Sequence, residues 1–234
     1  MKTTHLTGGR AARALPLAGV CAAVATVAGY MTIGPNPDGD ARAATDVRYY
    51  TAHHTHILIA GILLTYAAVL SALFGVAVWD RIRRGRLHPA VGATALVAVA
   101  VTGVSDLTNA GAWYALGTMG GKDTIQPATF QTLHLAAAGS NLAAVAGFGL
   151  LLVVAGGAGV SARILPGWLA WSGLLLGVVE LVQTPVEVGF IAGLLALGWM
   201  CAAGIAMFLR PDVPDPAGAD RRPERIAEPA LSGS

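Results

Sequence analysis

Six long apolar runs limit the folds open to this chain more than any other feature. We place them near 14–33, 54–79, 89–110, 130–156, 165–184 and 186–209. Each run meets the requirement for a transmembrane helix, which is about 20 predominantly apolar residues. The sequence therefore predicts an all-α, polytopic membrane helical bundle with six transmembrane helices.

The composition agrees with a membrane location. Of the 234 residues, 55% are hydrophobic and 12% are charged, about half of the roughly 25% charge of a soluble domain. The 30 glycines suit helices that pack closely in lipid, and they would permit a homo-oligomer. No basic block with interleaved aromatic residues is present, so nucleic acid is not an expected partner. Cys21 and Cys201 each stand alone in an apolar run, which indicates neither a disulfide framework nor a metal motif.

Polar segments flank the apolar region. Residues 1–13 form a basic leader, 14–209 the transmembrane domain, and 210–234 a tail rich in proline and charge. We predict a disordered, cytoplasmic tail. The basic leader and first apolar run also suit a signal peptide, but we favour an uncleaved helix.

Basic residues in the short loops predict the orientation. Four arginines lie between residues 81 and 86, and Arg163 lies in the loop between the fourth and fifth runs. We therefore expect a multi-pass protein of the bacterial cytoplasmic membrane with both termini in the cytoplasm. The segments 34–53, 111–129 and 184–186 would then face outward.

Polar residues gather near the predicted outer ends of the helices. Positions along each helix, at about 1.5 Å per residue, place them in the outer third of the membrane. They are His53, His54, His56, Asp106, Asn109, Gln131, His134, Asn141, Glu180, Gln183 and Glu187. Ionised groups are costly in lipid, so we expect these side chains to face an outward-opening pocket inside the bundle.

The histidines indicate a cofactor. His53, His54, His56 and His134 are candidate ligands for copper or zinc, both of which bind neutral imidazole. His56 and His134 alone, facing each other across a four-helix bundle, are candidate axial ligands for haem. Histidines just before a span also occur as plain interfacial residues, here beside Tyr49.

The carboxyl groups indicate proton chemistry. Asp106, Glu180 and Glu187 are candidate catalytic acids because burial favours the protonated form of a carboxyl group. They would act on an apolar lipid, quinone or isoprenoid. Alternatively, Asp106 and Glu180 would orient ligating histidines or make structural hydrogen bonds.

Helices two and three share a sequence pattern with helices four and five. His56 precedes Pro89 by 33 residues, and His134 precedes Pro166 by 32. This spacing predicts a tandem repeat of one helical hairpin, with its axis along the membrane normal.

The stretch that starts the fifth helix carries a resemblance. Leu165, Pro166, Trp168 and Leu169 form a Leu-Pro-x-Trp-Leu helix start. With its surroundings, about one third of the chain, it resembles a group of small polytopic membrane proteins of GC-rich bacteria. The resemblance implies a membrane bundle and no particular activity.

Three functions follow from these patterns. The first is a membrane enzyme or redox protein with a cofactor in an outward His/carboxylate pocket. The second is a non-catalytic membrane component: a regulatory, self-protection or transport subunit. The third is an acid-catalysed isoprenoid or lipid cyclase or isomerase. Membrane lipid and an apolar small molecule are the expected partners.

Overall fold

The computed structural model of this chain describes residues 14–34, 43–85, 87–122, 126–183 and 190–210. Within these residues the regular structure is entirely helical. The elements are η1 (Leu15–Leu17), α2 (Ala18–Ile33), α3 (Ala43–Arg84), α4 (Pro89–Gly120), α5 (Pro127–Ala162), α6 (Gly167–Gln183) and α7 (Phe190–Leu209). The all-α helical bundle is confirmed. The predicted leader, 1–13, and residues 211–234 of the predicted tail lie outside the described residues.

Five helical stretches are long and apolar enough to cross a membrane. They are Leu15–Ile33, Val47–Arg84, Pro89–Gly120, Pro127–Ala162 and Ile191–Leu209. The fifth predicted span, 165–184, corresponds to α6, whose 17 described residues are apolar but fall just below that length. The helices thus have the form of a multi-pass membrane protein.

The three central helices are much longer than the sequence analysis predicts. Helices α3, α4 and α5 have 42, 32 and 36 residues, so they measure about 63, 48 and 54 Å at 1.5 Å per residue. The hydrocarbon core of a bilayer is only about 30 Å thick. The sequence predicts that each helix ends where its apolar run gives way to polar residues. In the structure, the helical hydrogen bonding continues past that point.

Local signals do explain where some of these helices start and end. Pro89 and Pro127 each stand in the first turn, where a missing N–H costs nothing. His88 also caps α4, because its Nδ1 accepts a hydrogen bond from the Ala90 N–H. Arg163 ends α5 in the left-handed conformation, with φ 54°.

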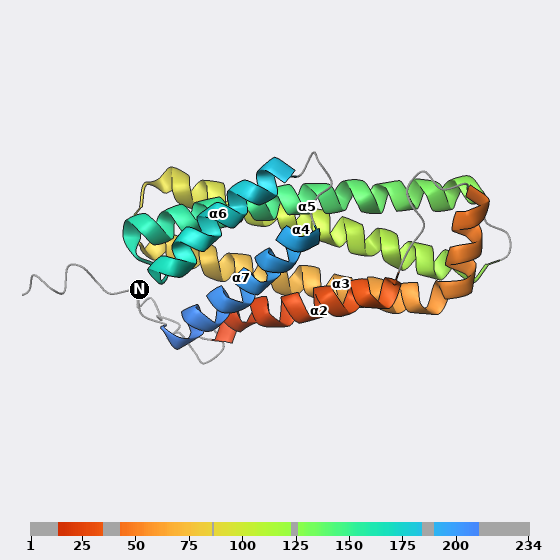
Figure 1. The fold of residues 1–234 in the computed structure, drawn as a ribbon, viewed down its shortest axis with the longest axis horizontal. Helices are drawn as coiled ribbons and strands as arrows, with labels where there is room; N and C mark the ends of the chain where they lie inside the picture. The colour runs from red at the N-terminus through yellow and green to blue at the C-terminus, as the bar shows by residue number, and fades with distance from the viewer. Residues whose placement is uncertain (1–13, 35–42, 86, 123–125, 184–189, 211–234) are drawn as a thin grey trace, which may run out of the picture.

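The helices form a closed arrangement around an interior space. Helices α4 and α5 and most of α3 lie side by side along the long axis, whereas the first part of α3 runs across one end of the bundle (Figure 1). Helices α6 and α7 cover only one half of the long axis (Figure 1). Each helix from α2 to α7 contacts the next, and α7 contacts α2. We call the end where α3 finishes and α4 begins the arginine end. The opposite end, where α4 finishes and α5 begins, is the tyrosine end, after Tyr50 of α3.

Two separate apolar cores hold the bundle together. The arginine-end core packs residues such as Phe74, Leu152 and Leu169 from α3, α5 and α6, together with Trp199 of α7. The tyrosine-end core contains Tyr50 and other buried residues of α3, α4 and α5, plus Ile33 of α2.

The two halves of the predicted tandem repeat differ in size. Helix α4 has 32 residues, and its proposed counterpart α6 has 17. Helix lengths therefore give the repeat no support, and it stays a prediction.

Candidate functional site

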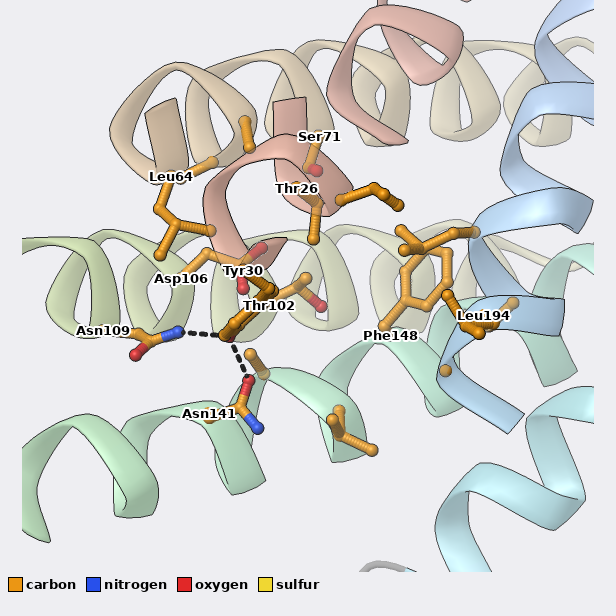
Figure 2. A pocket seen from close by; sticks show the side chains of 18 of the residues that line it. Thr26, Tyr30, Leu64, Ser71, Thr102, Asp106, Asn109, Asn141, Phe148 and Leu194 are labelled. Carbon is orange, nitrogen blue, oxygen red and sulfur yellow. Dashed lines mark hydrogen bonds between the residues drawn. The ribbon is translucent and has the colours of Figure 1, made fainter. Parts of the chain in front are cut away.

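A cavity of about 680 Å³ lies at the centre of the bundle, with lining residues from all six α-helices. Most of its wall is apolar, and side chains such as Leu64, Phe148 and Leu194 face it (Figure 2). The polar side chains of the wall are Thr26, Tyr30, Ser71, Thr102, Asp106, Asn109, Asn141 and Glu180.

A chain of hydrogen bonds connects three helices at the cavity wall. The Asn109 side-chain amide of α4 donates to the Tyr30 hydroxyl oxygen of α2 at 2.9 Å. The Tyr30 hydroxyl in turn donates to Oδ1 of Asn141 on α5, at 3.0 Å (Figure 2). These bonds hold the three side chains in a defined arrangement, as a recognition site requires.

The polar face of α4 is the part of the site that the sequence pattern predicts best. Thr102, Asp106 and Asn109 follow the i, i+4, i+7 spacing of one helical face, and all three line the cavity. The Thr102 hydroxyl donates a hydrogen bond within its own helix, to the Ala98 carbonyl at 2.9 Å. Because Asn109 is bonded to Tyr30, Asp106 is the α4 group best suited to meet a ligand.

The two predicted carboxyl groups of α4 and α6 reach the same cavity. Asp106 and Glu180 both line it, as their expected convergence requires. Glu180 is 2% exposed and packs closely against Gly149 of α5. A Cβ added at Gly149 would lie 2.9 Å from the Glu180 Cβ. Glu187 lies outside the described residues. A catalytic role for any of these acids stays a prediction.

The histidines of α3 lie outside the cavity lining. His53, His54 and His56 are all exposed. The His53 ring stacks on Tyr49 at 4.6 Å, and the His54 ring lies over Gly121 at the end of α4. A helix turns about 100° per residue, so His54 points in a different direction from His53 and His56, which are three residues apart.

His134 belongs to an aromatic cluster at the tyrosine end. Its Nδ1 lies 2.5 Å from the Tyr50 hydroxyl, and its ring meets Trp113 edge to face at 6.2 Å. Tyr50 stacks on Phe130, with ring centres 5.6 Å apart and planes at 4°. His134 thus has a packing role that the sequence did not reveal.

Among the described residues, the predicted histidines do not line the cavity that Asp106 and Glu180 line. In the described part of the chain, no three His, Cys, Asp or Glu side chains form a group that could hold a metal ion. His53, His54, His56 and His134 are therefore not gathered into one metal site. The pairing of His56 with His134 around haem also lacks support, because His56 is exposed and His134 is held by Tyr50.

Sequence reasoning missed Tyr30, which joins the two sides of the polar cluster. It lies near the end of the first apolar run, in α2. An aromatic residue at such a position is ordinarily an interfacial anchor. The positions of Tyr30, Asn109 and Asn141 in the sequence do not predict these hydrogen bonds, because the three residues are brought together only by the tertiary structure.

Comparison of the chain with models of protein families, with curated proteins and with solved structures finds no match. The resemblance drawn from Leu165, Pro166, Trp168 and Leu169 accordingly stays a prediction.

Proposed function

We propose that this chain is a membrane component that binds a small amphiphilic molecule inside its helical bundle, in a transport or regulatory role. One observation carries the proposal: a central cavity with a mostly apolar wall and one polar cluster. Pockets for small molecules typically have volumes of about 300–1,000 Å³, apolar walls and a few placed polar groups. A cavity of about 680 Å³ falls inside that range.

The depth of the cavity suits a ligand that arrives from lipid. Asp106 lies 17 residues into α4 from Pro89, and Glu180 lies 13 residues into α6 from Gly167. At 1.5 Å per residue these distances are about 25 and 20 Å from the arginine end. Both positions fit within a hydrocarbon layer about 30 Å thick.

The location of the histidines favours binding over cofactor chemistry. The enzyme and redox hypothesis requires histidines and carboxyl groups in one pocket. No histidine is among the described residues that line the cavity. Acid-catalysed cyclisation needs only the carboxyl groups, and turnover of an isoprenoid or lipid substrate would distinguish it from binding.

Filling the cavity from Gly193 of α7 is expected to abolish ligand binding. Gly193 lines the cavity, and a Cβ added there meets nothing within 4 Å. We therefore expect Gly193→Phe to fold normally and to lose at least tenfold in affinity for a hydrophobic fluorescent probe. Fluorescence titration of the protein in lipid nanodiscs measures this loss.

Gly198→Phe is the matched control. Gly198 lies on the same helix, an added Cβ there also meets nothing within 4 Å, and it is not a lining residue. The control should bind the probe like the wild type. Equal binding by the wild type and both variants would contradict the proposal.

The arginine end is proposed to face the cytoplasm, in accord with the basic loop that follows α3. Cysteine labelling tests this orientation after Cys21 and Cys201 are replaced by serine. Thr51 near the tyrosine end and Arg84 at the arginine end are both exposed. We expect a membrane-impermeant maleimide to label Thr51→Cys in intact cells and Arg84→Cys only after permeabilisation. The reverse pattern would show that the protein has the opposite orientation. Labelling of both variants in intact cells would show that α3 does not cross the membrane.

A further inference from the structure

The charge of the cavity wall restricts which ligands it can hold. The wall contains two carboxyl groups, Asp106 and Glu180, and the described lining residues include no lysine, arginine or histidine. A carboxylate away from water requires a compensating charge or hydrogen-bond donors. A ligand that brings a positive charge would meet this requirement at Asp106.

Asn109, the polar neighbour of Asp106 on α4, is already engaged within the protein. Its side chain is 4% exposed, and its amide nitrogen is already bonded to Tyr30. Its Oδ1 is buried and has no hydrogen-bond partner within the part of the chain that the structure describes. This oxygen has almost no accessible surface and is drawn turned away from Asp106, so a ligand in the cavity would not reach it (Figure 2). Asp106 is therefore the acceptor on this face of α4 that a ligand can meet.

Asp106 lies at the polar side of the cavity, near Asn109 of the same helix. Asp106 and Asn109 are three residues apart, a spacing that puts side chains on the same helical face one turn apart. Both are drawn at the polar side of the cavity, beside Tyr30, with Phe148 and Leu194 further along the wall (Figure 2). A ligand for this cavity would therefore place a donor group at α4 and an apolar body toward α7.

We infer that the cavity binds an amphiphile with a protonated amine, and that its ammonium group donates to the Asp106 carboxylate. An ammonium group carries a positive charge and offers three donors and no acceptor, which suits a carboxylate. A neutral alcohol offers one donor and no charge, and a carboxylate or phosphate head would repel Asp106. This inference rests on the proposed function, since it names the ligand class for the same cavity.

Photolabelling with two matched probes tests the inference. One probe is a long-chain primary amine with a diazirine in its chain, and the other is its N-acetyl derivative, which has the same chain and no charge. Both are added to the full-length protein in lipid nanodiscs, and labelled peptides are quantified by mass spectrometry. We expect the amine to label the cavity-lining parts of α2, α4 and α7 at least fivefold more than its N-acetyl derivative does.

The variants assign the preference to Asp106. We expect Asp106→Asn to remove the preference for the amine, and Asp106→Glu to retain it. Asp80→Asn is the control, because Asp80 pairs with Arg83 and Arg84 at the arginine end, away from the cavity. Should Asp106→Asn fail to fold, the comparison of the two probes on the wild type still decides the ligand charge.

The outcomes separate this inference from the proposed function. Equal labelling by both probes, blocked for both by Gly193→Phe, would overturn the amine preference and leave cavity binding intact. Labelling that Gly193→Phe leaves unchanged would overturn both. An amine preference that survives in Asp106→Asn would overturn the assignment of Asp106.

Discussion

Replacing Gly117 by valine is expected to force α3 and α4 apart and to destabilise the whole bundle. A Cβ at Gly117 would lie 2.4 Å from the Leu58 amide nitrogen and 2.6 Å from its Cα. Gly61 makes the reciprocal approach, where a Cβ would lie 2.5 Å from the Tyr114 amide nitrogen. Backbone atoms cannot rotate away as a side chain can, so the helices must separate. We expect a loss of about 3 kcal/mol, the upper part of the range for overpacking.

Gly111 provides the control on the same helix, because a Cβ there meets nothing within 4 Å. Gly111→Val introduces the same side chain without the clash and should leave the stability within about 0.5 kcal/mol of the wild type. Thermal unfolding in detergent, followed by intrinsic fluorescence, compares the two variants. Similar melting of both would show that α3 and α4 do not pack as closely as described.

Replacing Tyr50 by alanine is expected to open the tyrosine end while the arginine end stays folded. Tyr50 is fully buried, stacks on Phe130 and bonds to His134. Truncation of a buried aromatic residue to alanine typically costs about 3–5 kcal/mol. We expect faster hydrogen exchange in residues 47–57 and 127–137. Residues 74–82, in the other core, should exchange as in the wild type.

Two further variants separate packing from hydrogen bonding at this site. Tyr50→Phe retains the ring stack and loses the bond to His134, so we expect a cost of about 1 kcal/mol. Tyr66→Ala is the control, because Tyr66 lies on the same helix but is 64% exposed. Equal hydrogen exchange in Tyr50→Ala and Tyr66→Ala would contradict a packed aromatic cluster.

Several features could be predicted from the sequence because they depend on local periodicity and composition. The apolar runs predict the helices, and Pro89 stands where α4 begins. The i, i+4, i+7 stripe puts Thr102, Asp106 and Asn109 on the interior face of α4, where all three line the cavity. Burial of a helical stripe follows from its spacing, whatever the partner helices are.

The histidines show where such reasoning stops. Three histidines within four positions suggest one cluster of metal ligands. In the structure, His53, His54 and His56 are exposed and lie outside the cavity. His134 finds its partner in Tyr50, 84 residues away in the chain. That contact exists because α3 begins before its apolar run and packs against α5 at the tyrosine end.

The helical class, the apolar segments and the inward face of α4 can be predicted from the amino-acid sequence, since hydrophobicity and helical periodicity are properties of neighbouring residues. The full lengths of α3, α4 and α5, and the bridge that Tyr30 makes between Asn109 and Asn141, are visible only in the folded protein. The tertiary structure also separates the carboxyl groups from the histidines. These features depend on how closely whole helices approach, and that approach is set by packing between residues far apart in the chain.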